Sequence, residues 1–367
     1  MTDSWLLAGR AAALQNEGDW IRFDTGVDSV LVTRSAAGLR GFHNVCQHRG
    51  HRLCKGSAGC AKAFTCPYHH WSYGLDGHLL HVPDVESFGV DFDPRERGLR
   101  AVAVAEGNGG VFVHLGDPQP LTRVQALFAG PGAVVLEGAI DPGRCAAVVA
   151  ALTALRPEEH PFSPVFAAHS IGVILDHAPD EDEYFDALPV YHSLLAALDE
   201  GDLEGALLAR LAAEVGHPVK PVSHPERGPY GPTTLRRLPK AGIIPPHCET
   251  DQLRNPMHAA LCAEIDTAEL VSWYVCLQAP QSGGELAIHS VPGDSELGRR
   301  VYRDRMNAAG LLAGTELERI APRAGDLVIF NGGRHFHQVL PVGGDRDRWT
   351  MGGFLCRTRD GGYGVFS

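Results

Sequence analysis

Two short motifs combine thiolate and imidazole side chains at a fixed spacing. The first is Cys-x-His at Cys46 and His48, and the second is Cys-x-x-His at Cys66 and His69. A [2Fe–2S] cluster in which two thiolates hold one iron and two imidazoles hold the other needs this donor set. A structural zinc ion with the same four ligands is the alternative. The motifs therefore predict a metal centre in the first third of the chain, and a cluster there would store one electron.

A second set of metal ligands is expected much later in the chain. The segment "IIPPHCETD" contains His247 and Glu249, which on a strand project from the same face about 6.5–7 Å apart. Asp251 is too far along an extended strand to join them. The segment "FNGGRHFHQVLPV" then supplies His335 and His337. Two imidazoles and one carboxylate on one face are typical of a mononuclear non-heme Fe(II) site that leaves positions open for other ligands.

Size and composition limit what the protein does. The 367 residues leave room for two or three domains, and the net charge of −12 argues against nucleic acid and anionic membrane surfaces as partners. No run approaches the roughly 18 apolar residues of a membrane helix. The start lacks the pattern of a secretory signal. Nine scattered cysteines favour a reducing compartment over a disulfide scaffold, so we expect a cytoplasmic protein.

The elements that must position these ligands fall into three stretches. Short β runs separated by turns fill the first 115 or so residues, and "GDPQP" at 116–120 has the composition of a linker. Asp141 followed by Pro142 predicts a helix start, and residues 192–215 form a second helical stretch. From about Thr233 the pattern is β again. We therefore predict a mainly β protein with a helical shoulder, divided into a domain at 1–118, a linker at 119–130 and a domain at 131–367.

The first domain resembles the Rieske domain of ring-hydroxylating oxygenase large subunits. The resemblance is carried by "FHNVCQHRGHRLC", "CPYHHWSYGLDGHL" and the flanking "WLLAG" and "GGVFVHL". It implies that Cys46 and Cys66 hold one iron of a [2Fe–2S] cluster, and that His48 and His69 hold the other. The extra cysteines of the respiratory version are missing, which implies the lower-potential cluster of the oxygenases.

The chain also departs from that family. His51 and His70 stand where the family usually has small residues, either as surface histidines or with a role in proton-coupled electron transfer. The helical iron motif that should follow in such an oxygenase is missing, because Asp186 and His192 have the wrong spacing and no second histidine follows. We expect that segment to be the start of a helix.

The second domain instead resembles the 2-oxoglutarate/Fe(II) dioxygenases with a prolyl-hydroxylase-like double-stranded β-helix. The segments that carry the resemblance are "RLPKAGIIPPHCE", "WYVCLQAPQSGGELAI" and "PRAGDLVIFNGGRHFHQVLPVGGDRDRWTMGGFL". It implies a jelly-roll, cupin-like fold with His247, Glu249 and His337 as iron ligands, His337 being preferred to His335 because "x-V-x-P-V" follows it. Halogenating relatives leave the carboxylate position empty, so Glu249 disfavours halogenation.

The same resemblance implies where 2-oxoglutarate would bind. The family anchors the distal carboxylate of this co-substrate with a basic residue soon after the last iron ligand, often with a hydroxyl two residues later. Arg348 with Thr350 fits this description, and Arg346 is the competitor. The guanidinium fork of either arginine matches a carboxylate.

These features together predict a non-heme iron oxygenase with a Rieske cluster that feeds electrons to Fe(II), with 2-oxoglutarate as the expected co-substrate. The reaction would hydroxylate a C–H bond of a small molecule, or lead to desaturation or ring closure. Two alternatives stay open: a reductase-dependent Rieske-type monooxygenase that does not use 2-oxoglutarate, and a non-catalytic redox or oxygen sensor. We expect a separate reductase or ferredoxin, because the chain has no Gly-rich dinucleotide fingerprint. Homo-oligomers are compatible with the sequence, and segments 158–232 and 291–320 are expected to form lids over the iron.

Overall fold

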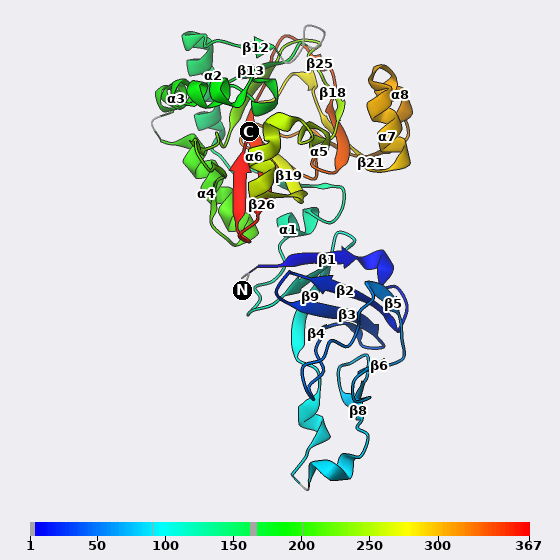
Figure 1. Ribbon diagram of the computed structural model, residues 1–367. Helices are drawn as coiled ribbons and strands as arrows, with labels where there is room; N and C mark the ends of the chain where they lie inside the picture. The colour runs from blue at the N-terminus through cyan, green and yellow to red at the C-terminus, as the bar shows by residue number, and fades with distance from the viewer. Residues whose placement is uncertain (1–3, 90, 162–166, 200) are drawn as a thin grey trace. The chain divides into compact units, whose positions relative to one another are not determined.

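The computed structural model describes residues 4–89, 91–161, 167–199 and 201–367. The chain divides into two units, Met1–Leu121 and Thr122–Ser367, each with its own sheets. Figure 1 shows the path of the chain through both. Residues 119–130, which we expected to be a linker, contain helix α1 (Arg123–Leu127), and its buried side chains pack in the core of the second unit. Residues 122–130 therefore belong with the second unit, and residues 119–121 with the first.

The first unit is built on an antiparallel sheet with the strand order β1-β10-β9-β4-β3-β2-β5. Its strands are β1 (Leu6–Arg10), β2 (Asp19–Asp24), β3 (Ser29–Ser35), β4 (Gly38–His43), β5 (Ala58–Cys60), β9 (Ala101–Gly107) and β10 (Gly110–His114). Asn108 and Gly109, both with positive φ, make the tight turn between β9 and β10, as expected for an Asn-Gly hairpin. Alternate residues of these strands, among them Val30, Val32 and Val111, form the core.

A smaller sheet of β6 (Phe64–Thr65), β7 (Ser72–Tyr73) and β8 (Leu79–His81) adjoins the loops that bear the Cys/His motifs. The short helices of this unit are η1 (Ala11–Ala13), η2 (Val85–Phe88) and η3 (Pro94–Arg97). A separate core cluster that includes Phe42, Trp71 and Tyr73 surrounds Cys46 and Cys66. The cysteines are thus held by packed side chains as well as by their loops.

The second unit contains the larger sheet, with the order β11-β23-β19-β26-β17-β13-β12; β27 also pairs with β26, and β14 pairs with β27. Its strands are β11 (Ala133–Leu136), β12 (His160–Pro161), β13 (His169–Ile171), β14 (Val219–Pro221), β17 (Thr234–Leu238), β19 (Ile265–Gln278), β23 (Leu327–Phe330), β26 (Arg348–Thr358) and β27 (Tyr363–Phe366). A second sheet has the order β18-β24-β21-β22. It consists of β18 (Ile244–His247), β21 (Leu286–Pro292), β22 (Glu316–Ile320) and β24 (His335–Val339). Residues of both sheets line a common pocket, the arrangement of a jelly roll.

Short paired strands complete the β structure: β15 (Ser223–His224) with β16 (Gly228–Pro229), and β20 (Ser282–Gly283) with β25 (Val342–Gly343). The smaller helices are α5 (Glu249–Gln252), α6 (Ala259–Glu264), α7 (Glu296–Arg303), α8 (Ala308–Leu311), η4 (Leu175–His177), η5 (Pro256–His258) and η6 (Arg305–Asn307). Helices α7, η6 and α8 occupy most of the predicted lid 291–320. The other predicted lid, 158–232, contains helices α3 and α4, and its residues 162–166 lie outside the described ranges.

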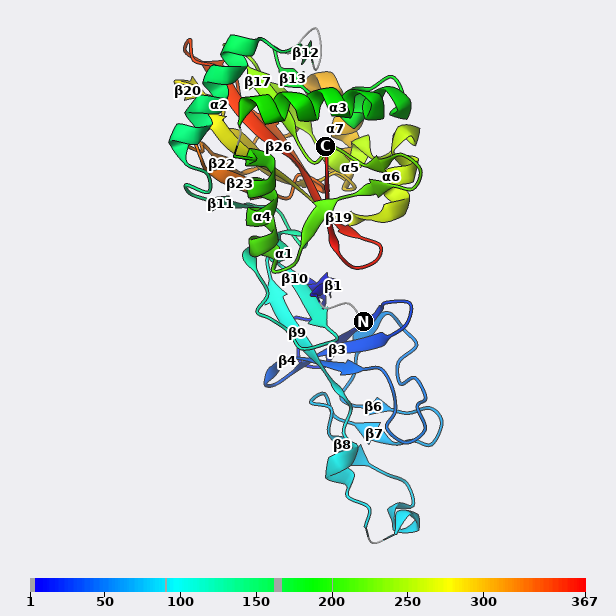
Figure 2. The same ribbon diagram turned by 90° about the vertical axis from the view of Figure 1, so that its left-hand side faces the viewer.

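Helices α2 (Pro142–Leu155), α3 (Glu181–Leu198) and α4 (Leu203–Val215) lie along one face of the larger sheet (Figures 1 and 2). The predicted start of α2 is confirmed: the Asp141 side chain accepts the Arg144 amide, and Pro142 is the first helical residue. The second helical stretch differs from its prediction. The α3 helix starts at Glu181, so Asp186 and His192 lie inside it, and it ends before Asp202, which caps α4.

The helices bury apolar stripes against the sheet. In α4, Leu203, Leu207, Leu211 and Val215 follow at intervals of four residues and are all buried. They belong to one core cluster with Trp273 and other residues of the larger sheet. This helical layer covers one face of the sheet and leaves the other face free to line the pocket between the sheets.

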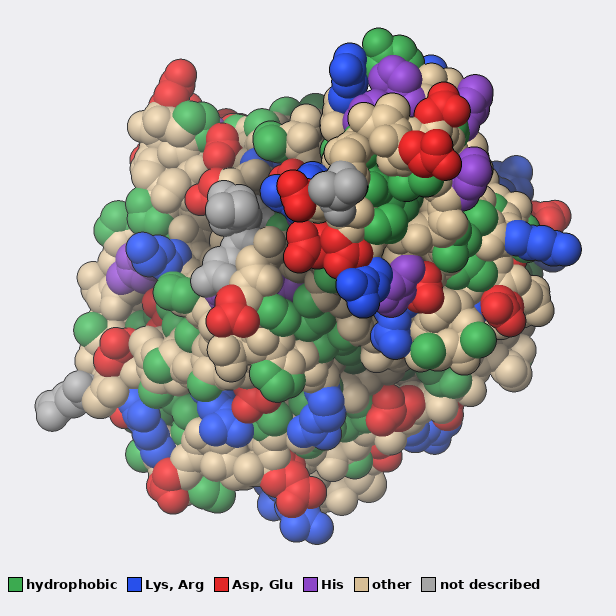
Figure 3. Space-filling model, turned by 90° about the horizontal axis from the view of Figure 1, so that it is seen from below, with side chains coloured by type: hydrophobic (Ala, Val, Ile, Leu, Met, Phe, Trp, Pro, Cys, Tyr) green, Lys and Arg blue, Asp and Glu red, His purple; other side chains and the backbone are tan. Residues whose placement is uncertain are grey.

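No helix in the described part of the chain is both long and apolar enough to cross a membrane. On the face shown in Figure 3, Lys and Arg side chains are interspersed with acidic and apolar ones.

Candidate metal centres

The loops that carry Cys46 and Cys66 have the same backbone hydrogen-bond pattern. In each loop the cysteine amide donates to the carbonyl five residues later, at 2.8 Å, and the cysteine carbonyl accepts from the amide four residues later, at 3.0 Å. The first loop follows β4 and the second connects β6 with β7. Two equivalent loops can thus offer one thiol and one imidazole each.

The four predicted cluster ligands come together at the tips of these loops. Cys46 and Cys66 are buried, and the rings of His48 and His69 lie 4.5 Å apart between centroids. The His48 ring stacks on Trp71, with 4.8 Å between centroids and an angle of 8°. Packing therefore fixes the orientation of this imidazole before any metal is present.

Tyr73 is hydrogen-bonded to the first loop. Its hydroxyl accepts a hydrogen bond from the Gln47 amide, at 3.0 Å, and lies 3.3 Å from the Cys46 sulfur. Since the amide already donates to the oxygen, the hydroxyl hydrogen is available for the sulfur. Burial raises the pKa of the Cys46 thiol, and the neighbouring Cys66 adds to this effect. A metal ion that binds the thiolate would offset the free-energy cost of ionising this buried thiol.

The donor set fits a two-iron cluster. The buried Nδ1 of His48 has no hydrogen-bond partner among the described residues, as expected for an atom that ligates a metal. Ligands of a single zinc ion lie within about 4.6 Å of one another, twice the Zn–S bond length. Among the described residues, the group of three or more potential ligands that converges within 4.8 Å lies elsewhere in the chain. The spread of these four side chains therefore favours a cluster over zinc.

The two histidines that depart from the family pattern differ in exposure. His70 is exposed and has a positive φ of 58°, a conformation that small residues adopt more easily. His51 is half-buried, and its ring lies 5.7 Å from that of Tyr68. Exposure of His70 agrees with the simpler expectation of a surface histidine.

The converging group lies in the second unit and consists of His247, Glu249 and His337. His247 ends β18 and is directly opposite His337 in the register of β18 and β24, with 4.1 Å between the ring centroids. Cys248 has extended backbone angles, so Glu249 projects to the same side as His247 although it begins helix α5. The Glu249 Oε1 lies 3.7 Å from the Nε2 of His247 and 3.5 Å from that of His337.

Backbone carbonyls orient both imidazoles. The Nδ1 of His247 lies 2.9 Å from the Pro245 carbonyl, and the Nδ1 of His337 lies 3.2 Å from the His335 carbonyl. A carbonyl only accepts, so each Nδ1 carries the hydrogen, and each Nε2 faces Glu249 and in the neutral ring offers its lone pair to a metal. Metal-binding histidines typically have this arrangement.

Glu249 is buried, and burial alone would raise its pKa. When no metal is bound and the rings of His247 and His337 are protonated, their hydrogen bonds and charges outweigh that effect and hold the pKa of Glu249 well below its usual range. Ser272 donates to its Oε1 at 3.2 Å, a contact that the sequence did not indicate. The carboxylate is therefore ionised and held in place, as a metal ligand must be.

The glycines that precede His337 allow this close packing. The Gly332 carbonyl accepts the Glu249 amide at 3.1 Å. A Cβ at Gly332 would lie 2.8 Å from the Cε1 of His337 and would collide with the Ser272 hydroxyl. Glycine is required here because the backbone of the β23–β24 connection passes directly against the ligands.

Arg348 and Thr350 lie in the same pocket as the three converging side chains. Both are on one face of β26 and both are buried, with exposed fractions of 3% and 2%. Arg346, the competing candidate, is exposed and donates to the Pro280 carbonyl at 3.2 Å. Of the two arginines considered, the structure thus brings Arg348 to the pocket.

Arg236 and Tyr274 also line this pocket, and the sequence analysis missed both. Arg236 is the register partner of Thr350 across β17 and β26, so it points to the same side of the sheet. Burial lowers the pKa of Arg236, Glu249 counteracts this, and Arg348 adds to it. The signal in the sequence was a charged residue inside a strand with buried neighbours, "TTLRRL". The pocket therefore contains two guanidinium groups beside the converging ligands.

The remaining candidates lie elsewhere. Asp251 forms ion pairs with Arg305, at 2.7 Å, and Arg254, and Asp186 pairs with the exposed Arg227. Asp251 is therefore occupied by surface arginines, as expected from its distance to His247 along the strand.

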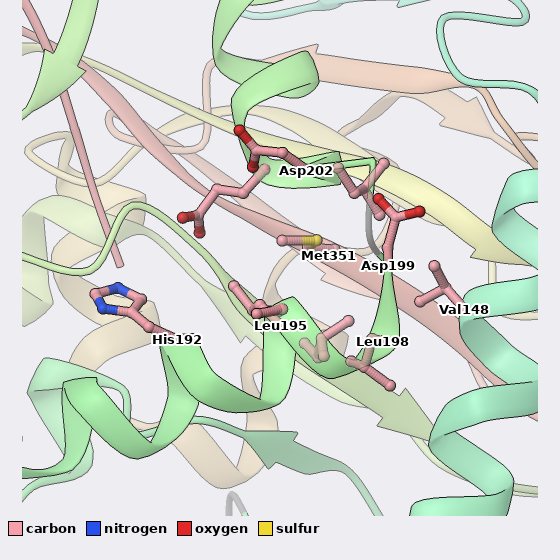
Figure 4. A pocket seen from close by; sticks show the side chains of 11 residues that line it. Val148, His192, Leu195, Leu198, Asp199, Asp202 and Met351 are labelled. Carbon is pink, nitrogen blue, oxygen red and sulfur yellow. The ribbon is translucent and has the colours of Figure 1, made fainter.

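His192 lines a separate cavity of about 440 Å³ under helices α2, α3 and α4. In Figure 4, Met351 lies among the side chains of this cavity, which include His192, Asp199 and Asp202. The carboxylates have structural partners: Asp199 pairs with Arg144, and Asp202 accepts the Gly205 amide at the start of α4. This cavity lies on the helical side of β26, opposite the face that bears Arg348.

Comparison with known families assigns both regions. Residues 141–362, more than half of the chain, match the family described as carrier-protein-independent halogenase WelO5. Residues 4–101 match the Rieske [2Fe-2S] domain. The Rieske domain and the jelly-roll fold that the sequence predicted are thereby confirmed, and the likeness to prolyl hydroxylases stays a prediction.

Individual relatives match about a third of the chain. The chain is 40% identical over 117 residues to the glycine betaine monooxygenase oxygenase subunit of Pseudomonas aeruginosa (strain UCBPP-PA14), which covers 32% of this chain and 27% of the relative. It is 38% identical over 135 residues to the carnitine monooxygenase oxygenase subunit of Escherichia coli (strain K12), covering 36% and 35%. It therefore spans only about a third or less of these relatives.

Among solved structures, the chain is similar to naphthalene 1,2-dioxygenase from Rhodococcus sp. bound to indole. The TM-score is 0.34 and the identity 16%, with 65% of this chain and 60% of that chain covered. For the quaternary ammonium Rieske monooxygenase CntA with L-carnitine, the TM-score is 0.32 and the identity 23%, with 44% and 52% covered. These likenesses are too weak to carry an argument about either unit.

Proposed function

This chain belongs to the carrier-protein-independent halogenase WelO5 family and also carries a Rieske domain, and from that premise we propose that it is a non-heme iron oxygenase acting on a small molecule. The observation that carries the proposal is the convergence of His247, Glu249 and His337 in a chain that also has both Cys/His loops. Fe(II) in the converging site would supply O2 activation, and a [2Fe–2S] cluster would supply electrons one at a time. Cys46, His48, Cys66 and His69 would hold that cluster.

Residues of this chain suit 2-oxoglutarate as co-substrate. Arg348 offers a buried fork for a carboxylate, and the Thr350 hydroxyl lies on the same strand face. Arg236 adds a second positive charge in the pocket. A dicarboxylate that neutralises both guanidinium groups would remove the repulsion between them, so the pocket favours a doubly charged anion over a monoanion.

The relatives favour the alternative version, in which a reductase supplies all electrons and 2-oxoglutarate is not used. They are named as oxygenase subunits of monooxygenases, and they match about a third of this chain. They support that version better than they support 2-oxoglutarate. The compounds in their names do not transfer to this chain, since each match covers only about a third of the chain and about a third or less of the relative. In both versions a separate reductase or ferredoxin would reduce the Rieske cluster, but in the 2-oxoglutarate version turnover does not depend on it, because the co-substrate supplies two electrons.

We propose oxygenation rather than halogenation, in spite of the family's name. The Glu249 carboxylate fills the place between the two imidazoles, with Oε1 3.5 and 3.7 Å from their Nε2 atoms. A halide bound at that place would have to displace a buried, hydrogen-bonded carboxylate. The complete ligand sets in both units also argue against a non-catalytic sensor.

The test is a comparison of four reactions with the cluster- and iron-loaded full chain: with and without 2-oxoglutarate, and with and without a ferredoxin/reductase pair. Oxygen consumption and succinate are measured in each. Succinate that appears with 2-oxoglutarate alone supports the dioxygenase version. Oxygen consumption that depends on the reductase and ignores 2-oxoglutarate supports the alternative. If neither addition changes oxygen consumption above that of the His247→Ala variant, the oxygenase proposal is wrong.

A further inference from the structure

Ser272 lies in the middle of β19, beside the proposed iron site. The preceding residue, Val271, packs in the core cluster that the helices share with the larger sheet, so Ser272 faces the other side of the strand and lines the pocket with the converging ligands. Its register partners on β23 and β26 are Phe330 and Phe354. A hydroxyl is thus placed between two aromatic side chains, where packing alone would favour an apolar residue.

The Ser272 hydroxyl contacts the carboxylate oxygen that faces both imidazoles. It donates to the Glu249 Oε1 at 3.2 Å, and the same oxygen lies 3.5 Å from the Nε2 of His337 and 3.7 Å from that of His247. Ser272 is 5% exposed, so the carboxylate rather than bulk water satisfies this hydroxyl. The three contacts together turn Oε1 toward the space between the imidazoles.

The serine contact differs from the two imidazole contacts in what a metal ion would do to it. A metal held by the three converging side chains would take the Nε2 lone pairs of His247 and His337, since each Nδ1 is bonded to a backbone carbonyl. The imidazoles could then no longer donate to Glu249, whereas the Ser272 hydroxyl still could. Because glutamate is long and flexible, a hydrogen bond that already orients its carboxylate reduces the conformational entropy lost when the metal binds.

We propose that Ser272 is a positioning residue of the metal site: its hydroxyl holds the Glu249 carboxylate with Oε1 turned toward His247 and His337, and so strengthens the binding of a divalent metal ion. The inference rests on the proposed function, because it takes Glu249 as an iron ligand. The backbone of Glu249 is fixed separately, since its amide donates to the Gly332 carbonyl at 3.1 Å. Ser272 therefore acts on the orientation of the side chain and not on the path of the chain.

The experiment measures Mn(II) binding to the full chain with its cluster assembled and oxidised, a state without an EPR signal of its own. Mn(II) prefers carboxylate and imidazole ligands to thiolates, and the EPR signal of free Mn(II) gives the dissociation constant. We expect Ser272→Ala to weaken Mn(II) binding about tenfold, as is typical when the partner of a metal ligand is removed. Ser170→Ala is the matched control: Ser170 is buried in the same sheet, and its hydroxyl donates to the His160 carbonyl at 3.4 Å. It should leave the constant within about twofold.

A double-mutant cycle shows whether Ser272 acts through Glu249. In a Glu249→Ala background the hydroxyl has lost its acceptor, so adding Ser272→Ala should change the dissociation constant by less than about twofold. The EPR spectrum of bound Mn(II), which depends on the arrangement of its ligands, should differ from that of the parent chain in Ser272→Ala and stay the same in Ser170→Ala.

Two results would overturn the role of Ser272: unchanged Mn(II) binding in Ser272→Ala, or an equal loss in the parent and Glu249→Ala backgrounds. Equal binding of Mn(II) by the parent chain and by His247→Ala would instead contradict the metal site itself. That result would sink the proposed function and the inference together, and the His247→Ala comparison keeps it distinct from the failure of Ser272 alone.

Discussion

The guanidinium of Arg348 lies over the ring of Tyr274, with its Cζ 4.9 Å from the ring centroid. Both side chains line the pocket with the converging ligands, and Arg348 is 3% exposed. Burial raises the pKa of Tyr274 to about 12, with Arg348 acting in the opposite direction. The phenol is therefore neutral at ordinary pH, and its ring face holds the arginine in one orientation.

Replacing Arg348 should show whether Arg348, rather than the exposed Arg346, anchors the co-substrate. We expect Arg348→Ala to weaken 2-oxoglutarate binding about 100-fold, because a charge-assisted bidentate pair worth about 3 kcal/mol is lost. Arg348→Lys should recover part of the loss, since lysine keeps the charge but not the fork. Calorimetric titration of the metal-loaded protein without oxygen measures this. Arg346→Ala is the control, and a larger loss in that variant would reverse the assignment.

The Tyr73 hydroxyl should raise the reduction potential of the cluster. Its hydroxyl can donate to the Cys46 sulfur, and such a bond stabilises the reduced, more negative state. A hydrogen bond of about 1 kcal/mol corresponds to about 40 mV for a one-electron couple. Tyr73→Phe is therefore expected to lower the reduction potential by about that amount, measured by redox titration with EPR detection. Tyr68→Phe removes a hydroxyl from an exposed residue and should leave the potential unchanged; equal shifts in both variants would contradict this role.

Metal analysis should distinguish the two centres. The parent chain is expected to hold about three irons and two acid-labile sulfides, since a cluster contains two of each. His247→Ala should reduce iron to about two and leave the sulfide constant. Asp251→Asn is a close control, because Asp251 pairs with surface arginines. A variant at His247 that loses sulfide as well would mean that the centres are not independent.

The helical layer should govern the stability of the second unit. Leu207 in α4 is fully buried among other core residues. We expect Leu207→Ala to lower the free energy of unfolding by about 3 kcal/mol, from lost burial and the cavity that remains. Val190→Ala in α3 changes a side chain that is 73% exposed and should shift it by less than about 0.5 kcal/mol. Urea unfolding followed by circular dichroism gives both values, and similar effects in the two variants would show that α4 is not part of this core.

What the sequence could predict depended on how local each feature is. Cys46 and His48, like His247 and Glu249, are two residues apart, so loop or strand geometry alone brings them together. The pairing of His247 with His337 required a resemblance to a known family, because β18 and β24 are far apart in the chain. The candidate ligands could therefore be named in these cases.

Features that depend on how strands far apart in the sequence pair with one another could not be predicted from the sequence. Arg236 faces the pocket because β17 pairs with β26 so that it lies opposite Thr350, and a shift of one residue would turn it away. Ser272 reaches Glu249 only through the path of β19. The break between α3 and α4 depends on Asp202, whose capping bond competes with helix continuation in a segment of high helix propensity.

Removing the carboxylate at the iron site should open it to halide. In Glu249→Ala the two imidazoles stay oriented by the Pro245 and His335 carbonyls, and the place of Oε1 is vacated. We expect Co(II), used as a spectroscopic probe, to bind about tenfold or more weakly, since one of three ligands is lost. Chloride should then change the visible spectrum of bound Co(II) in Glu249→Ala and not in the parent chain. Glu249→Asp keeps a carboxylate and serves as control; a chloride response in the parent chain would show that Glu249 does not occupy the halide position.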